Sequence, residues 1–221
     1  MKRGGKMSIF QQTDRRILKS KQALKDALLQ CLMKKELNDI TIIEIVRIAN
    51  VNRGTFYKNY ETKQSIFDDI LKDVYEDLTL AFRYPYQKND ILAIKNLSPK
   101  DVKLFEHVDN YRNFYNLIFL NASFYPYQKQ ILKFIKQIQL EELETLHYTN
   151  KLDLELLTIY RAHAIFGMIG EWVESGYTYS ASYLAEQYVK FIHISQISEK
   201  YKVQKINQNI LFPVNTDSTQ I

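Results

Sequence analysis

The sequence predicts an all-α protein, with a three-helix domain at the N-terminus followed by a larger helical domain. Six glycines and four prolines in 221 residues are few helix breakers for so long a chain, which favours helices over short strands and turns. Apolar residues recur at three-, four- and seven-residue intervals through most of the chain, as on one face of a helix. We find no strand-like alternation of useful length and no internal repeat.

Basic residues are concentrated in the first third of the chain. Residues 1–63 hold 14 Lys and Arg against 6 Asp and Glu, a net charge of +8, and residues 64–221 hold 16 against 19, a net charge of −3. A basic module on a slightly acidic body predicts an anionic partner for the first third alone. Nucleic acid is the first candidate for that partner, and an anionic membrane surface is a weaker second.

Several classes of protein are disfavoured by what the sequence lacks. Cys31 is the one cysteine, so neither an intrachain disulfide nor a thiolate metal cluster can form. No apolar run suits a signal peptide or approaches the ~18 residues of a membrane span. Nucleotide-binding loops, metalloprotease motifs and nucleophile elbows are absent, and the four histidines are scattered. We therefore expect a cytoplasmic protein that is not an enzyme, uses no cofactor or metal and has no membrane partner.

The first 63 residues are predicted to comprise a flexible arm, residues 1–12, and a helical domain, residues 13–63. The arm carries charge and two adjacent glycines but no apolar period. A helix is expected from Asp14 to Lys35, because its apolar residues form one stripe. Its acidic start and basic end also suit the helix dipole.

Two short helices joined by a turn are predicted to follow. Thr41 begins the first of them in a capping box, with the carboxylate of Glu44 three residues later. That helix is expected to end at Asn50, a residue type that tolerates left-handed backbone. Asn52 can then cap a helix from Arg53 to Tyr60. A turn of about three residues between two short helices is typical of a helix-turn-helix.

The second helix of this motif is predicted to enter the major groove of DNA, which is wide enough for a helix. Arg53 can bond a guanine edge in two places, Asn59 an adenine edge, and Thr55 can contact a thymine methyl. A phenol, an ammonium group and a helix N-terminus can each bind a phosphate. A glycine lets the backbone approach the DNA closely. The alternative interpretation is that this helix has a structural role only and does not bind DNA. The predicted DNA-binding residues are Thr41, Arg53, Gly54, Thr55, Tyr57, Lys58, Asn59 and Lys63.

The rest of the chain is predicted to form a helical regulatory and dimerisation domain, residues 64–201, and a polar tail, residues 202–221. Thr62 can cap its first helix, Pro99 suits the first position of another, and Ser180 or Ser182 can cap the last. The expected helices are Lys63 to Arg83, one beginning at Ser98-Pro99, Tyr111 to Leu120, Pro126 to Tyr148, Asp153 to Glu174, and one ending near Tyr201.

A dimer interface is predicted on the last two long helices. Gly167 and Gly170 lie three residues apart on one helix, where each glycine costs ~1 kcal/mol relative to alanine. That cost is tolerable where two helices pack closely, and a dimer would present two recognition helices to a palindromic site. The alternative is that these apolar residues belong to the core of a single chain. The predicted interface residues are Ile165, Gly167, Met168, Ile169, Trp172, Val173, Leu184 and Tyr188.

Aromatic side chains in the middle of the chain could line a cavity for a small-molecule effector. Aromatic residues at helical spacing also occur as ordinary core, so both interpretations stand at this point. The candidate pocket residues are Phe105, His107, Tyr111, Phe114, Tyr115 and Phe119. No residue pattern names the effector.

The segment from Ile40 to Phe67 resembles the N-terminal domain of TetR/AcrR-type transcriptional regulators. It shares with them the apolar residue and Thr at the start of one helix, Ala before the turn, and the run Arg-Gly-Thr-Phe-Tyr-Lys-Asn-Tyr that begins at Arg53. Many members carry His where this chain has Asn59. The resemblance implies that Thr41, Tyr57 and Lys63 contact phosphates and that Arg53, Thr55, Lys58 and Asn59 face bases.

The C-terminal part resembles a subgroup of these regulators that includes the dihydroxyacetone-kinase activator. The likeness rests on Gly167, Gly170, Trp172 and Gly176, followed by the run that begins at Ser182. The expected function is therefore that of a homodimeric regulator that binds a palindromic operator in double-stranded DNA. A ligand-responsive repressor is the expected mode. The alternative is a helical co-activator or adaptor that acts through protein contacts with weak or no DNA binding.

Overall fold

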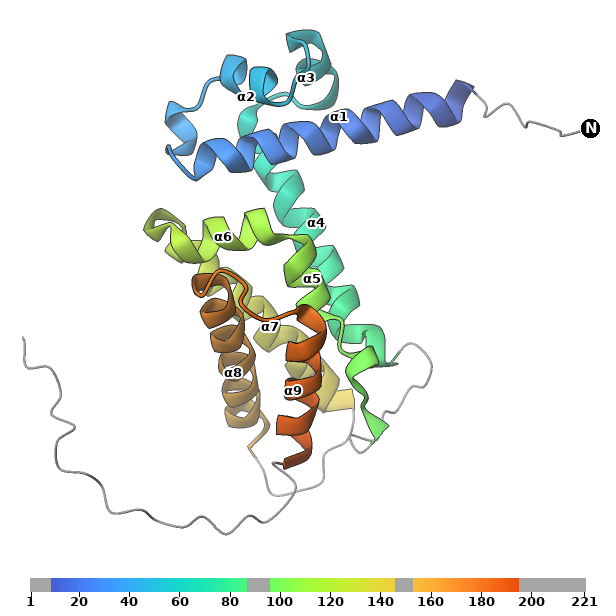
Figure 1. Cartoon of the computed structure of the whole chain (residues 1–221), viewed down its shortest axis with the longest axis vertical. Coiled ribbons are helices and arrows are strands. Elements are labelled where there is room, and N and C mark those ends of the chain that lie inside the picture. Colours follow the sequence, from blue (N-terminus) through green and yellow to red (C-terminus); the bar gives the residue numbers. More distant parts are fainter. Residues whose placement is uncertain (1–8, 87–95, 146–152, 195–221) are drawn as a thin grey trace, which may run out of the picture.

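A computed structural model describes residues 9–86, 96–145 and 153–194, and every regular element in these ranges is helical. Figure 1 shows two parts joined by one long helix. The first part, which we call the head, is made of α1 (Ile9–Leu32), α2 (Ile42–Ile48) and α3 (Arg53–Asn59). The second part, the body, contains α5 (Leu104–Asn110), α6 (Arg112–Leu120), α7 (Tyr125–Thr145), α8 (Leu154–Glu174) and α9 (Ala181–Ile194).

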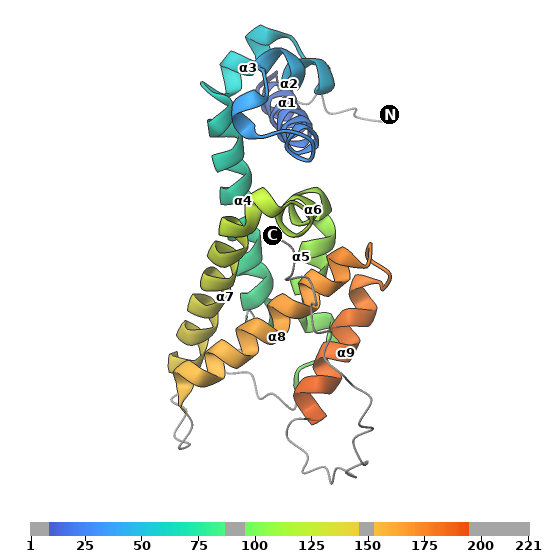
Figure 2. The same ribbon diagram turned by 90° about the vertical axis from the view of Figure 1, so that its left-hand side faces the viewer.

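Helix α4 (Lys63–Arg83) belongs to both parts. Its first turns pack against α1, and the rest runs into the body beside α5 and α7 (Figure 2). The hydroxyl of Thr62 accepts a hydrogen bond from the Ser65 backbone N–H, so the predicted cap of this helix is present. The head also meets the body directly, because α1 contacts α6 and the Asn121 amide donates to the Leu32 carbonyl at 3.2 Å.

The head has a core that runs without a break into the body. Leu24 and Leu28 of α1, Ile45 of α2 and Phe56 of α3 are completely buried. Ile66 of α4 joins the same cluster. Burial of this kind stabilises by roughly 1.5–3 kcal/mol for each large side chain, which explains how helices of seven residues remain folded although they are too short to persist alone.

The body is a bundle in which α7 and α8 form an antiparallel pair and α6 lies across its upper end (Figure 2). Gly170 of α8 lies against Phe119 of α6, and a Cβ atom added to this glycine would lie 3.0 Å from the Phe119 ring. Phe166 contacts the same ring, with 5.1 Å between ring centroids. The close helix approach that Gly170 permits is therefore within one chain.

Two helix boundaries differ from the sequence prediction. Helix α1 begins at Ile9 rather than Asp14 and ends at Leu32. Pro99 begins a single 3-10 turn, η4 (Pro99–Asp101), instead of a long helix. Buried Val102 then adopts extended backbone, which stops the turn from continuing into α5. Short 3-10 turns also occur at η1 (Leu37–Asp39), η2 (Tyr84–Tyr86) and η5 (Ala122–Phe124).

The predicted ends of α8 and the start of α9 are present. Asp153 caps α8 by accepting hydrogen bonds from the backbone N–H groups of Glu155 and Leu156. Gly176 follows the helix with a φ of +72°, the left-handed conformation that glycine adopts without strain. Ser180 is the cap of α9, because its hydroxyl accepts from the Tyr183 N–H. The predicted arm, residues 1–12, lies mostly outside the described residues, and the tail, residues 202–221, lies entirely outside them.

Most of the residues predicted for a dimer interface lie inside the single chain. Ile165, Ile169, Trp172, Val173 and Leu184 are all buried within the body, so these five side chains form little of the surface of the single chain. Each of the helices α8 and α9 also carries exposed apolar residues on its outward face. Because both faces are apolar, the sequence pattern did not show which face is internal. Gly167 is exposed, with no atom within 4 Å of an added Cβ. Met168 and Tyr188 are half-buried.

None of the helices within the three described ranges is long and apolar enough to cross a membrane.

Candidate nucleic-acid interface

The helix-turn-helix begins with the capping box that the sequence predicts. The Thr41 hydroxyl accepts from the Glu44 backbone N–H at 3.2 Å, and the Glu44 carboxylate accepts from the Thr41 N–H at 2.9 Å. The Lys35 ammonium also binds this carboxylate. Together with the Thr41 contacts, that hydrogen bond lowers the pKa of Glu44 to about 2. The N-terminus of α2 is thus fixed from both sides.

The turn between α2 and α3 is set by two asparagines. Asn50 has a φ of 52°, the left-handed conformation that asparagine tolerates better than most residues. Asn52 caps α3 by accepting from the Thr55 backbone N–H at 2.7 Å and from the Thr55 hydroxyl at 3.0 Å. A Cβ added to Gly54 would lie 3.3 Å from this Asn52 oxygen. A side chain at position 54 would therefore press on the cap, which is a structural reason for the glycine in addition to the predicted approach to DNA.

Helix α3 has one buried face and one exposed face. Phe56 is completely buried, and Tyr60, which follows the helix, is nearly so. On the opposite face Arg53, Tyr57 and Lys58 are exposed. An Arg53 guanidinium N–H donates to the Tyr57 hydroxyl at 3.1 Å. These two side chains therefore present one connected polar surface, beyond the body at the far end of the head (Figure 1).

The structure corrects the outward orientation expected for Asn59. This residue is half-buried, and its amide donates to the Thr55 carbonyl at 2.7 Å and to the Ser20 hydroxyl at 3.3 Å. Asn59 thus ties α3 to α1. The periodicity of α3 places position 59 beside the exposed face, but the nearness of Ser20 depends on how α1 crosses α3. Thr55 is also half-buried, with its hydroxyl bonded to Asn52.

Lys63 holds the N-terminus of α4 against the segment that precedes α2. Its ammonium donates to the carbonyls of Asn38 and Ile40, each at 2.8 Å. Thr41, the next residue after Ile40, is half of the capping box, and both Thr41 and Lys63 were predicted to contact phosphates. The structure brings these two positions to one end of the motif, and two of the three Lys63 donors are already used there.

A buried ion network beneath α3 was not predicted from the sequence. The Lys25 ammonium of α1 is 2.9 Å from an Asp69 carboxylate oxygen of α4 and also binds Asp73. The Tyr60 hydroxyl donates to Asp69 at 2.7 Å. Burial raises the pKa of Tyr60, and the hydrogen bond to Asp69 raises it further. The four-residue spacing of Lys21 with Lys25 and of Asp69 with Asp73 places each pair on one helix face, but spacing alone does not show that the faces meet.

Asp69 is held in its charged form by the same network. Partial burial raises its pKa, but the hydrogen bonds from Tyr60 and Lys25 oppose this, so that the pKa lies below the usual value. The network joins α1, α4 and the residue that ends α3. It therefore fixes the exposed face of α3 relative to the long helix that enters the body.

The aromatic residues predicted to line a ligand pocket lie together on α5 and α6. Phe105 contacts Trp172, with ring centroids 6.1 Å apart, and Tyr115 packs against Phe114. Phe105, Phe114 and Tyr115 are almost fully buried and fill this region with their own side chains. Tyr111 and Phe114 also line a cleft of about 460 Å³ between α1, α4 and the α5–α6 junction.

His107, also predicted for the pocket, has both ring nitrogens in hydrogen bonds. Nδ1 lies 2.7 Å from an Asp77 carboxylate oxygen of α4, and Nε2 lies 2.9 Å from the Tyr115 hydroxyl of α6. Burial lowers the pKa of His107, although Asp77 opposes the shift. His107 thus connects α4, α5 and α6.

Comparison with known proteins supplies evidence independent of this geometry. Residues 95–194 match the TetR-type family described as transcriptional regulator C-terminal region. An HTH-type transcriptional regulator of Bacillus subtilis (strain 168), YxbF, is 28% identical over 110 residues. Residues 95–194 are thus similar to the C-terminal region of TetR-type transcriptional regulators. The alignment with YxbF spans 50% of this chain and 29% of the length of YxbF.

Two solved structures of transcription regulators have a similar fold to this chain. The dihydroxyacetone kinase operon activator DhaS has a TM-score of 0.54 at 16% identity, and the alignment covers 80% of this chain and 95% of DhaS. The fatty acid degradation regulator FadR from Bacillus halodurans has a TM-score of 0.54 at 14% identity, covering 78% of this chain and 94% of FadR. At these identities the likeness concerns the fold alone.

Proposed function

We propose that this chain is a TetR-type transcriptional regulator, a homodimer that binds a palindromic operator through α3 and releases it when an effector binds the body. The exposed face of α3 carries the proposal. Arg53, Tyr57 and Lys58 lie on it, and the helix is capped at Asn52 and packed through Phe56. A rigid helix with exposed donors is what major-groove recognition requires.

Individual residues have different roles in this proposal. Arg53 reads a guanine edge after exchanging its Tyr57 hydrogen bond for the base, and Lys58 and Thr55 contact neighbouring bases. Tyr57, Lys63 and the N-terminus of α2 at Thr41 contact phosphates. Asn59 contributes by holding α3 on α1, because its amide protons are used within the head. Gly54 keeps the start of α3 free of side-chain bulk.

A second copy of the chain is the proposed occupant of the outward apolar face of α8 and α9. Leu156 and Tyr160 of α8 are 64% and 71% exposed, and Tyr183 and Phe191 of α9 are 45% and 53% exposed. Gly167 lies on the same side of α8 and leaves room for a close neighbour. A two-fold dimer would place two α3 helices against two half-sites of one operator.

Selection of genomic DNA fragments tests the operator model. The purified protein is incubated with sheared DNA at two salt concentrations, and the bound fragments are sequenced. A palindromic motif that persists at the higher salt is the expected result. Weak binding without a motif, lost as salt rises, would mean electrostatic contact alone and would favour the adaptor alternative.

Point variants separate base reading from phosphate contact. Arg53→Ala should weaken binding to the selected site by about 1–3 kcal/mol and relax sequence preference at one position. Lys58→Ala should have a similar effect at a neighbouring position. The matched control is Lys72→Ala, since Lys72 is exposed on α4, and it should leave the affinity unchanged. Equal losses in all three variants would argue against sequence reading by α3.

Sedimentation equilibrium tests the dimer separately from DNA binding. Tyr160→Glu places a charge at the centre of the proposed interface and should give monomers. Leu120→Glu changes a side chain of comparable exposure, 52%, on α6, outside that face, and should leave the dimer intact. A dimer that survives Tyr160→Glu would move the interface elsewhere.

The effector is proposed to act by population shift. It would favour a dimer whose recognition helices no longer match the spacing of the half-sites. Repression follows if the operator overlaps a promoter. The same DNA affinity with and without the effector would defeat this part of the proposal.

A further inference from the structure

Gln139 of α7 is an unusual residue in the interior of the body. Its side chain is completely buried, and within the described part of the chain neither its amide oxygen nor its amide nitrogen has a hydrogen-bond partner. A buried amide without a partner is strongly unfavourable, and such groups are rare in folded proteins. An unpaired polar group in a core therefore points to a partner that is absent from the free chain.

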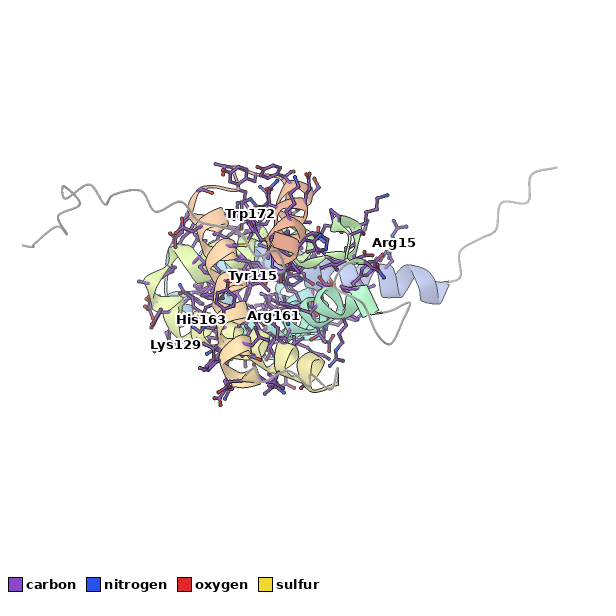
Figure 3. The ribbon with its side chains drawn as sticks, turned by 90° about the horizontal axis from the view of Figure 1, so that it is seen from below. Arg15, Tyr115, Lys129, Arg161, His163 and Trp172 are labelled. Atoms are coloured by element: carbon purple, nitrogen blue, oxygen red, sulfur yellow. The ribbon has the colours of Figure 1, made fainter. Side chains whose placement is uncertain are left out.

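Arg161 of α8 is the second group without a partner. It is half-buried, and among the residues that the structure describes it has neither an ion pair nor a hydrogen bond. Seen from below, Arg161 lies on the side of α8 that faces the middle of the bundle, whereas His163 and Lys129 lie toward the outside (Figure 3). The helical period agrees, because Arg161 shares a stripe with buried Thr158 and Ile165.

The two groups lie at the same level of the α7–α8 pair. Gln139 is about two turns from the end of α7, and Arg161 is about two turns from the start of α8. The two helices contact each other and run in opposite directions, and the end of α7 lies beside the start of α8 (Figure 2). Gln139 also lies on the buried stripe of α7 that contains Ile131 and Ile135. An inward amide and an inward guanidinium thus project from facing helices.

The acidic residue of α7 with a described side chain, Glu141, already has a basic partner. Glu141, two residues further along α7, binds the Arg83 guanidinium of α4 at 3.2 Å. That pair lies on an exposed part of both helices, away from the buried stripe. The Arg161 charge is therefore not neutralised by the one acidic side chain described on α7.

We propose that Arg161 and Gln139 form the head-group site for an organic carboxylate with an apolar body. This inference rests on the proposed effector response and gives the chemical class of the effector. A guanidinium binds a carboxylate through two parallel N–H donors. The Gln139 amide N–H donates to the same carboxylate, and its oxygen accepts from the remaining Arg161 N–H groups. Ile135 lies one turn from Gln139 on α7, and Ala162 and Ile165 follow Arg161 on α8; all three are buried, so the rest of the ligand contacts apolar side chains.

Calorimetric titration of the full chain with octanoate and with octanol tests the head group. Both probes have the same apolar chain, so their difference reports the carboxylate. We expect octanoate to bind at least about 10-fold more tightly, as charge-assisted hydrogen bonds allow. Arg161→Gln should remove this preference, and Arg161→Lys should retain part of it. Lys129→Gln removes an exposed cation from α7 and should leave octanoate binding unchanged.

Gln139→Leu gives a readout that a merely structural role would not produce. Replacing an unpaired buried amide with an apolar group of similar size should raise the Tm of the free protein, while octanoate affinity falls about 10-fold. Gln130→Leu, at an exposed position of α7, is the matched control and should change neither quantity. A lower Tm for Gln139→Leu, or octanoate affinity that Arg161→Gln does not alter, overturns the proposal.

The titrations contain no DNA, so their outcome is separate from that of the operator experiment. Operator binding without octanoate binding rejects the carboxylate site and leaves the proposed function standing. Octanoate binding without an operator keeps the site and rejects the regulatory role assigned to it.

Discussion

The helix-turn-helix of the head and the junction of α4, α5 and α6 in the body are stabilised by polar contacts of different range. In the head, Thr41, Asn52 and Thr62 each cap a helix within three residues of their own position. In the body, His107 connects Asp77 of α4 with Tyr115 of α6, across 30 and 8 residues. Short-range caps fix the starts of the short helices around α3, whereas the contacts of His107 depend on how α4, α5 and α6 are placed relative to one another.

The largest expected effect comes from emptying the core of the head. Phe56→Ala removes a completely buried ring and should lower the free energy of unfolding by about 3–5 kcal/mol. Trp172, the single tryptophan, lies on α8, so its fluorescence reports on the body, while far-UV circular dichroism reports on all helices. Urea unfolding of Phe56→Ala should shift the dichroism transition more than the fluorescence transition.

Coincident shifts in both signals would show that head and body unfold as one unit. Tyr57→Ala is the control for this experiment, because its ring lies beside Phe56 but is 49% exposed. It should change the unfolding free energy much less.

The ion network between α1 and α4 should have the next largest effect. Lys25→Met keeps most of the buried stem but leaves Asp69 and Asp73 without their shared cation. We expect a loss of about 2 kcal/mol, less than for a fully buried pair because both carboxylates are partly exposed. Lys72→Met removes an exposed pair with Glu76 and should cost no more than about 0.5 kcal/mol. Equal losses would contradict the importance of burial.

Helix caps should contribute similar, smaller amounts in the two parts. Thr41→Ala in the head and Ser180→Ala in the body each remove a side chain that accepts a backbone N–H, and each should cost about 1 kcal/mol. Thermal unfolding of the two variants gives the comparison. A negligible effect of Thr41→Ala would mean that Glu44 and Lys35 hold the start of α2 without it.

The smallest expected effect is a pH dependence that originates in the body. Because burial lowers the pKa of His107, the unfolded chain takes up a proton at this residue at a higher pH than the folded chain does. The folded state therefore keeps its full stability with respect to His107 above pH 6.5, which is the ordinary pKa of histidine. This stability decreases as the pH falls below that value.

Thermal unfolding between pH 8 and pH 5 should show this decrease for the wild type and a weaker one for His107→Gln. His163→Gln, at an exposed position, should behave as the wild type does. An unchanged slope in His107→Gln would assign the pH dependence to other groups.

The sequence by itself determined the local structure of the motif. Thr41 with Glu44, Asn50, Asn52 and Thr62 were all predicted in the roles that they have, because caps and turns depend on residues within a few positions of one another. Resemblance to TetR-type regulators was likewise carried by a contiguous run, and a separate segment, residues 95–194, matches a TetR-type family.

Tertiary structure decided which of two plausible faces is internal. Helix α8 is apolar on most sides, so its period could not show that Ile169 and Trp172 pack within the chain while Tyr160 lies outside. Asn59 points inward because Ser20, 39 residues away, lies beside it, and Lys25 meets Asp69 and Asp73 because α1 crosses α4. Contacts between distant residues depend on how helices cross, and helical periodicity describes each helix separately.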